Sequence, residues 1–262
     1  MRILFLGDVV GRPGRHALAA MLPRFRREAE IDVVVANGEN ASNGKGINPR
    51  AAEELRDVGV DVLTSGNHIW QSRDIVPYMQ ENQRLLRPLN YAPGVPGSGW
   101  TVCPARRGAP AVAVVNLIGR TFMPPAGCPF LAVESVLPDV RREATVIVVD
   151  MHGEATSEKV GMGWFLDGKV SAVIGSHTHV QTADERILPG GTAYLTDAGM
   201  CGPELSVLGV RTEQVLYRFR TQMPVRFDVA GGPVLVQGAM IDIDADTGRA
   251  TAIVRVRERV TL

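Results

Sequence analysis

Short runs of apolar residues, many of them β-branched, recur along the first two thirds of the chain, and each run ends in a polar segment. Runs of this length, bounded by turn-forming residues, predict buried β-strands. The six segments are RILFLGD (2–8), DVVVANGEN (32–40), DVLTSGNH (61–68), AVAVVNLIG (111–119), TVIVVDMHGE (145–154) and SAVIGSHTH (171–179).

Segments with helical patterning lie between these strands. Pro13 opens the first helix, and Pro23 is expected to kink or end it. Residues 48–59 predict a second helix, which Asn48 caps ahead of a proline and Gly59 ends. Two further helices are predicted at VESVLPDVRREA (133–144) and TSEKVGMGWFLDG (156–168). Alternating strands and helices predict a parallel or mixed central sheet with helices on its faces.

The pattern changes after about residue 200. Apolar and polar residues alternate there without intervening helices, and DADTG (244–248) predicts a hairpin turn. We expect antiparallel strands that complete a second sheet or a sheet edge. The segments are MPVRFDVA (223–230), PVLVQGAMIDID (233–244) and RATAIVRVRERV (249–260). The sequence has no internal repeat, and residues 1–262 are predicted to form a single domain.

Composition narrows the classes of function. The chain has 28 basic and 28 acidic residues, so no net field attracts it to nucleic acid or to an anionic membrane. No apolar run approaches the roughly 18 residues that span a bilayer, and Met1 and Arg2 lead into a strand rather than a signal peptide. Three widely spaced cysteines, Cys103, Cys128 and Cys201, argue against a disulfide framework and favour a reducing, cytoplasmic environment.

Metal-ligating residue types collect where the predicted strands end. Because the carboxyl ends of parallel strands share one edge of a sheet, side chains that follow them meet there. Four of the five histidines belong to this set, whereas His16 lies inside the first helix and is expected at the surface. The set comprises Asp8, Glu39, Asn40, Asn67, His68, His152, His177 and His179.

Each of these residues alone has a structural explanation. Asp8 could cap the following helix, Asn67 could occupy a turn, and His152 could be a buried structural histidine. His177 and His179 are stronger candidates, because residues two apart on an extended segment point the same way. Carboxylates, amides and imidazoles without thiolate suit Fe, Mn, Zn or Co better than Mg or Ca. The set exceeds the needs of one tetrahedral ion, but two ions roughly 3.5–4 Å apart, bridged by one carboxylate, would use it for phosphoryl hydrolysis.

Six stretches carry a family resemblance: LGDVVGRPGR (6–15), VANGENASNGKGI (35–47), TSGNHIW (64–70), VDMHGEATSEK (149–159), GSHTHVQTADERILPGGTAY (175–194) and TDAGMCG (196–202). They resemble the calcineurin-like metallophosphoesterases, and more closely the YmdB-like bacterial phosphodiesterases. The resemblance implies an α/β fold, a four-layer sandwich in which two mixed β-sheets pack together and helices flank them.

The resemblance also implies a role for each polar residue. Val10 stands where the wider superfamily has a histidine ligand, and Asn40 would supply the lost ligand. His68 would be the general acid that protonates the leaving oxygen, although Ile69 replaces the acidic residue that often follows this histidine. The implied ligands are Asp8, Glu39, Asn40 and His179 for one ion, and Glu39, Asn67, His152 and His177 for the other, with Glu39 as the bridge.

The implied activity is hydrolysis of phosphodiesters by a metal-bound hydroxide, with 2',3'-cyclic nucleotides such as 2',3'-cAMP as substrates. The implied cofactors are two divalent or transition metal ions per chain, Fe or Mn first and Zn as a further candidate. RNA ends are further candidate substrates, and a homo-oligomer is expected. Asp150, Glu154 and Asp197 are candidates for orienting the ligand imidazoles.

Two other interpretations stay open on sequence alone. GDVVGRPG (7–14) could be the phosphate loop of a dinucleotide-binding protein, although its glycine spacing differs from that fingerprint and Asp8 would repel a phosphate. The metallophosphoesterase fold could also serve a non-enzymatic regulator that binds a nucleotide or a protein.

Overall fold

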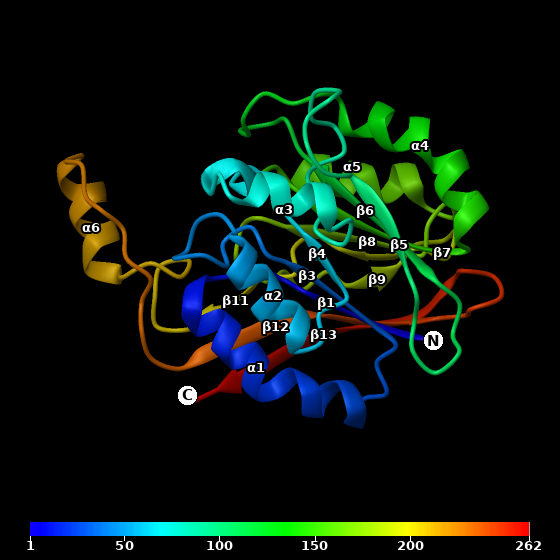
Figure 1. The fold of residues 1–262 in the computed structure, drawn as a ribbon, viewed down its shortest axis with the longest axis horizontal. Helices are drawn as coiled ribbons and strands as arrows, with labels where there is room; N and C mark the ends of the chain where they lie inside the picture. Colours follow the sequence, from blue (N-terminus) through cyan, green and yellow to red (C-terminus); the bar gives the residue numbers. More distant parts are fainter. Residues whose placement is uncertain (262) are drawn as a thin grey trace.

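A computed structural model, which describes residues 1–261, shows two mixed β-sheets packed together with helices on both outer faces (Figure 1). The strand order in the first sheet is β2 (Asp8–Val9), β11 (Met200–Pro203), β12 (Val234–Ile243), β1 (Arg2–Leu6), β3 (Val33–Asn37) and β4 (Val62–Thr64), and β13 (Ala250–Val260) pairs with β12. The order in the second sheet is β5 (Trp100–Cys103), β6 (Val112–Ile118), β7 (Val146–His152), β8 (Ala172–Ser176), β10 (Ala193–Leu195) and β9 (Arg186–Ile187).

The helices form the two outer layers. Those on the first sheet are α1 (Gly11–Glu28), α2 (Pro49–Asp57) and α3 (Ile75–Glu81), and those on the second are α4 (Pro129–Glu143) and α5 (Thr156–Leu166). The side chain of Asn48 caps α2 as predicted, by accepting a hydrogen bond from the backbone N–H of Ala51 at 2.8 Å. The predicted four-layer α/β sandwich is confirmed.

The predicted strands are buried on both faces, which explains their continuous apolar runs. In β1, Ile3 and Phe5 point into the core between the sheets, whereas Leu4 and Leu6 belong to the core under α1. Strands β1, β3 and β4 are parallel to one another, as are β6, β7 and β8. In Figure 1, β1 runs from the N-terminus at the right toward the left, so its carboxyl end lies on the side where α6 (Thr212–Thr221) stands apart.

Helix α1 continues past Pro23, so of the two predicted effects of this proline, a kink or an end, the end of the helix is wrong. Proline removes one backbone donor, whose acceptor would be the carbonyl of Ala19 one turn earlier. Ala19 and Pro23 both lie on the exposed side of α1, where water can satisfy that carbonyl.

The region after residue 200 differs from its prediction in two places. Residues 223–230 form no strand beyond a single bridge between Val210 and Val229, and they follow the unpredicted helix α6. Only Val215 of α6 is buried, so this helix lacks the apolar stripe that identifies a helix packed on a core. Strands β12 and β13 are antiparallel as predicted, but β12 lies inside the first sheet between β11 and β1.

Candidate metal centre

Asp8 lies at the start of β2, fully buried where β1 gives way to α1. The N-cap of α1 is Val10, and no side chain caps the helix, so the alternative in which Asp8 caps it is wrong. Its Oδ2 instead accepts a hydrogen bond at 3.0 Å from the backbone N–H of His177, which follows β8 of the second sheet. Asp8 therefore joins the carboxyl edges of the two sheets.

His177 and His179 reach this edge by a different route from the one predicted. Their φ angles are 101° and 63°, so the segment turns through left-handed conformations and is not extended. The two rings consequently have different neighbours. Nδ1 of His177 lies 3.1 Å from Nε2 of His152, whereas Nε2 of His179 lies 3.0 Å from Nδ2 of Asn40. Nε2 of His179 also lies 3.8 Å from Oδ1 of Asp8.

Glu39 occupies the centre of the cluster. Its Oε1 lies 3.2 Å from Nε2 of His152 and 3.3 Å from Nδ1 of His68, and its Oε2 accepts from the backbone N–H of His68 at 3.1 Å. Gly66 makes this approach possible, because a Cβ there would lie 2.1 Å from Nε2 of His152 and 2.4 Å from Oε2 of Glu39. Any other residue at position 66 would displace one of the two side chains.

Three buried oxygen atoms on the candidate ligands have no hydrogen-bond donor within residues 1–261: Oδ1 of Asp8, Oε1 of Glu39 and Oδ1 of Asn67. Buried polar atoms without partners destabilise a fold unless a ligand satisfies them. The ring nitrogens nearby are 3.0–3.8 Å from their neighbours, close to the roughly 3.3 Å that separates ligands sharing one tetrahedral ion. The donor set and its spacing therefore fit divalent metal ions.

The electrostatics of the cluster also favour a cation. Burial lowers the pKa of His152, but the carboxylates of Glu39 and Asp8 outweigh burial and raise it to about 9. Burial, together with the charge of His152, lowers the pKa of His177 to about 3. Burial raises the pKa of Asp8 to about 6, whereas the imidazoles hold the pKa of Glu39 well below its usual range despite burial. At neutral pH these four groups hold two carboxylates and one imidazolium.

His68 is oriented by neighbours that the sequence pattern did not identify. Its Nδ1 lies 3.1 Å from Oδ1 of Asn40 and 3.3 Å from Oε1 of Glu39, and its side chain is 27% exposed. Ile69, which follows it, is fully buried in the core under α1 and contributes nothing to the site. The acidic residue that often follows this histidine in the superfamily is thus replaced here by Asn40 and Glu39.

The three candidate orienting residues act in different ways. Glu154 reaches a ligand candidate directly, with Oε2 3.3 Å from Nε2 of His177. Asp150 acts through Ser176, whose hydroxyl donates to Asp150 at 2.6 Å and lies 2.9 Å from Nδ1 of His152. Asp197 holds the loop itself, because it accepts from the backbone N–H of Thr178 at 3.0 Å.

Sequence reasoning missed Asn37 and Lys159. Asn37 ends β3 and its Nδ2 lies 3.1 Å from Asp150 and 3.2 Å from Nδ1 of His152; a polar residue ending a buried strand was the available signal. Lys159 forms a buried ion pair with Asp197, with Nζ 2.7 Å from Oδ2. A lysine within a predicted helix gives no sign that it is buried.

The glycines of residues 7–14 serve packing. A Cβ on Gly7 would lie 2.1 Å from the carbonyl oxygen of Gly199, and one on Gly14 would lie 2.2 Å from that of Cys201. Gly11, with φ of +58°, makes the turn from strand to helix. Because protein backbone already occupies the space beside Gly7 and Gly14, the dinucleotide-loop interpretation is wrong.

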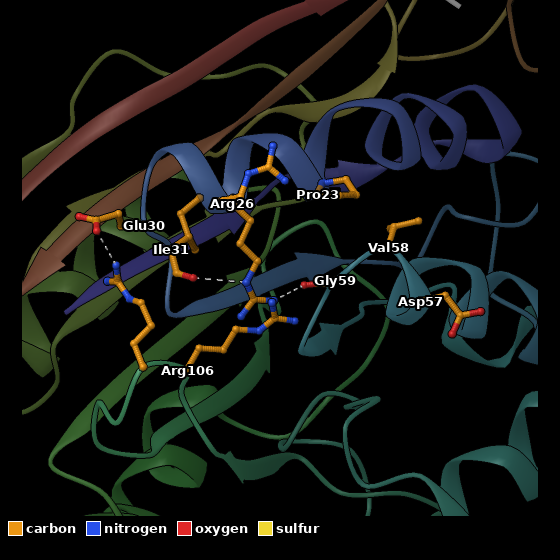
Figure 2. Close-up of a pocket in the computed structure, with 10 residues that line it drawn as sticks. Pro23, Arg26, Glu30, Ile31, Asp57, Val58, Gly59 and Arg106 are labelled. Carbon is orange, nitrogen blue, oxygen red and sulfur yellow. Dashed lines mark hydrogen bonds and ion pairs between the residues drawn. The ribbon is translucent and has the colours of Figure 1, made fainter.

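A cavity of about 530 Å³ lies away from this cluster, beside the segments that lead into β3 and β4 (Figure 2). Arg26 lines it and is 5% exposed. Its guanidinium donates to the carbonyls of Gly59 and Asp32 at 2.6 and 2.7 Å and pairs with Asp61 at 2.8 Å. These contacts join α1 to the two strand starts, so Arg26 has a structural role.

Two sheets with a buried cluster of carboxylates, amides and imidazoles at their common edge define a calcineurin-like metallophosphoesterase. The family model described as YmdB-like protein matches residues 4–256, and the chain belongs to this family. It is 45% identical to the 2',3'-cyclic-nucleotide 2'-phosphodiesterase of Bacillus subtilis (strain 168), over 98% of this chain and 96% of that protein.

Solved structures agree with this assignment. A hypothetical protein of Thermus thermophilus superposes with a TM-score of 0.92 at 40% identity and covers 99% of both chains. A novel phosphatase of Mycoplasma pneumoniae superposes with a TM-score of 0.91 at 32% identity, over 99% of this chain and 93% of that one. The 5'-nucleotidase of Candida albicans SC5314, at 11% identity and a TM-score of 0.56 over 98% of this chain and 50% of that one, shares the fold. The predicted enzyme class, a metal-dependent phosphodiesterase, is confirmed. Among residues 1–261, no helix is long and apolar enough to cross a membrane.

Proposed function

We propose that this enzyme is a dinuclear phosphodiesterase that hydrolyses 2',3'-cyclic nucleotides such as 2',3'-cAMP. The observation that carries the proposal is the set of three buried oxygen atoms without donors among residues 1–261, on Asp8, Glu39 and Asn67, together with the imidazoles of His152 beside Glu39 and of His179 beside Asp8. The name of the Bacillus subtilis relative supports this substrate class. RNA ends that carry the same cyclic phosphate are further candidate substrates.

Two groups of side chains would each hold one ion. Asp8, Asn40 and His179 surround one position, and His152 and His177 surround the other. Glu39 lies between them and would bridge, while Asn67 would complete the second group through its unpartnered oxygen. Bound divalent ions supply Lewis-acid chemistry, which activates water and neutralises charge on the phosphoryl group. The mixed donors favour Fe or Mn, with Zn as a further candidate.

His68 would act as the general acid. Contacts from Asn40 and Glu39 fix its Nδ1, so Nε2 is the nitrogen left to hold a proton for the leaving oxygen. Its partial exposure at the edge of a buried cluster allows a substrate to reach it. His68 is not among the proposed metal ligands, so binding of the ions and proton transfer are separable functions.

Hydrolysis assays on metal-loaded protein test the proposed function. We expect turnover of 2',3'-cAMP and of the generic diester bis-p-nitrophenyl phosphate after loading with Mn or Fe, and loss of both activities after chelation. Absence of both activities in protein that has bound the metal would contradict the proposal and favour the alternative of a non-enzymatic regulator.

We also propose that residues 1–262 act as one domain in the cytoplasm. Strands of both sheets share one apolar core, in which Ile3 and Phe5 of β1 meet Val146 and Val148 of β7. The three cysteines are free thiols, as expected in a reducing compartment.

A homo-oligomer is the arrangement that accounts best for α6. Residues 205–227, here called the projecting arm, leave seven large apolar side chains exposed: Leu205, Leu208, Leu216, Tyr217, Phe219, Met223 and Phe227. Helix α6, within the arm, stands clear of the sandwich (Figure 1). A standard interface buries roughly 800 Å² on each partner, and a group of large apolar side chains of this kind is typical of its buried centre. We propose that a second copy of the chain covers this surface.

Light scattering during gel filtration tests this assembly. The wild type is expected to elute as an oligomer, and Phe219→Glu, which places a charge on the arm, to elute as a smaller species. Phe122→Glu is the matched control, because Phe122 is 89% exposed but lies outside the arm. A monomeric wild type, or equal effects of the two substitutions, would contradict the role of the arm.

A further inference from the structure

A second cluster of charges lies beside the proposed metal centre, in a cavity of about 360 Å³ between the first turns of α1 and α2. Three arginines line it, Arg12 and Arg15 on α1 and Arg50 on α2, together with His16 on α1 and the loop residues Ser42 and Asn43. We call it the arginine pocket. Helices that follow parallel strands begin at the carboxyl edge, so this pocket opens at the same edge as the metal centre.

The arginine pocket has an excess of positive charge. Glu54 is the one acidic residue among those that line it, and it accepts from Nε of Arg15 at 2.7 Å and from Nε of Arg50 at 2.9 Å. The hydrogen bond from Arg15 lowers the pKa of Glu54, so this carboxylate is ionised and already shared between two guanidinium groups. Nε of Arg12 donates to Nε2 of His16 at 3.3 Å, and within residues 1–261 Arg12 has no carboxylate partner.

The two helices add to this field. Neither α1 nor α2 has an acidic residue in its first turn, so no carboxylate there neutralises the partial positive charge of their amino ends. Guanidinium groups bind phosphate through paired hydrogen bonds, and a pocket that combines them with helix amino ends suits a phosphate group. Of the described residues that line the pocket, none is a Phe, Tyr or Trp, and His16 is the one that carries an aromatic ring.

The distance along the chain to the proposed ligands is short. Asn43 follows Asn40 by three residues and Arg12 follows Asp8 by four, so the Cα atoms in each pair lie at most roughly 11–15 Å apart. A separation up to this limit can be spanned by one or two nucleotides of a strand. A 2',3'-cyclic mononucleotide without a 5'-phosphate has one phosphate, which the metal centre would take.

We infer that the arginine pocket binds a second phosphate of the substrate, on the 5' side of the nucleotide with the cyclic phosphate. This inference rests on the proposed function and narrows its substrate class to nucleotides extended at the 5' side. An internucleotide linkage or a 5'-monophosphate would supply the same chemistry.

Competition between substrates of different length tests the inference. We expect kcat/KM to be at least about fivefold higher for the dinucleotide ApA with a 2',3'-cyclic phosphate than for 2',3'-cAMP. The double variant Arg12→Ala/Arg50→Ala should lower this ratio to near one. Arg24→Ala should keep it, because Arg24 also lies on α1, is 76% exposed and forms a similar i,i+4 ion pair, with Glu28 at 2.7 Å. Equal ratios in the double variant and the wild type would overturn the inference. A third substrate, 5'-phosphorylated 2',3'-cAMP, distinguishes the two sources of phosphate. If kcat/KM increases for this substrate and not for the dinucleotide, the pocket binds a 5'-monophosphate.

A binding measurement on metal-free protein separates this inference from the proposed function. Fluorescence anisotropy with a labelled tetranucleotide that ends in a 3'-phosphate should show weaker binding by the double variant. The slope of log K against log salt should fall by about 0.7 for each phosphate that the variant no longer neutralises. If these differences appear while no cyclic nucleotide is hydrolysed, the proposed function is contradicted, but the arginine pocket is still a phosphate-binding site. If wild type and double variant bind with the same affinity and salt slope, the pocket is not a phosphate site.

Discussion

Asn40 contacts two imidazoles at once, which links the proposed metal centre to the proposed general acid. Its Nδ2 lies 3.0 Å from His179 and its Oδ1 lies 3.1 Å from His68. Val10, at the position of the superfamily's missing histidine, is 2% exposed and packs against Gly209. A Cβ on Gly209 would lie 2.6 Å from Cγ1 of Val10, so this side chain supports the base of the projecting arm.

Replacement of His68 tests whether metal binding and proton transfer depend on different residues. We expect His68→Ala to retain its metal and to lose about 10²–10³-fold in kcat for a substrate with a poor leaving group, because proton transfer to the leaving oxygen is lost. The loss should be smaller for bis-p-nitrophenyl phosphate, whose leaving group needs no proton. Arg24→Ala, at an exposed residue of α1 outside the arginine pocket, is the control. Loss of metal from His68→Ala would mean that His68 is a ligand.

The pH dependence of metal binding follows from the proton on His152. Metal binding requires a neutral imidazole, and the neighbouring carboxylates raise the pKa of His152 to about 9. The apparent affinity should therefore rise about tenfold per pH unit from pH 7 toward 9, with release of about one proton. Calorimetry in buffers of different ionisation enthalpy measures this proton. If the affinity is independent of pH over this range, His152 does not lose a proton when the metal binds.

At the scale of elements, the segment after β8 depends on a buried ion pair from α5. Lys159 and Asp197 are each about 1% exposed, and Asp197 also accepts the backbone N–H groups of Thr178 and Gly199. The pair therefore ties α5 to the loop between His177 and His179. Such a loop, with left-handed residues, needs support from outside its own sequence.

Lys159→Met should destabilise the protein by about 3–5 kcal/mol, because it leaves Asp197 buried without a counter-charge. The matched double variant Lys159→Met/Asp197→Asn should recover much of this loss, since the amide can still accept a hydrogen bond from Thr178. Urea unfolding measures both. A loss below about 1 kcal/mol for the single variant would show that the pair contributes little.

The elements that the sequence could predict are those whose side chains face a core. β1, β3, β7 and β8 have apolar runs because both of their faces are buried, and their polar ends identify the site. Helix α6 could not be predicted in this way, because most of its apolar side chains do not pack against the core of the protein. The position of β12 inside the first sheet depends on pairing across more than two hundred residues, which local patterning does not encode. Likewise, the orientation of His68 comes from Asn40 and not from its neighbour in sequence.

For the whole molecule, the proposed ligands join the two sheets. Asp8, Glu39, Asn40 and Asn67 come from the first sheet's strands, whereas His152, His177 and His179 come from the second. Ions held between them would cross-link the sandwich at its carboxyl edge. The same edge also bears the arginine pocket and the base of the projecting arm.

Removal of metal should therefore lower thermal stability. At a metal concentration 100-fold above Kd, ligand binding stabilises the native state by about 2.7 kcal/mol, which corresponds to a rise in Tm of about 5–10 °C for a chain of this size. Scanning calorimetry with and without a chelator measures the difference, and Tm should increase with the logarithm of free metal. A Tm that chelation leaves unchanged would contradict a metal link between the sheets.

The measurement that tests the central claim most directly is the metal-to-protein ratio after loading with Mn or Fe and removal of free metal. We predict about two ions per chain for the wild type, and for His16→Ala as control. Glu39→Gln, which removes the charge of the proposed bridge, should retain less than one. A wild type that binds one ion or none, or a Glu39→Gln variant that still binds two, would contradict the dinuclear centre.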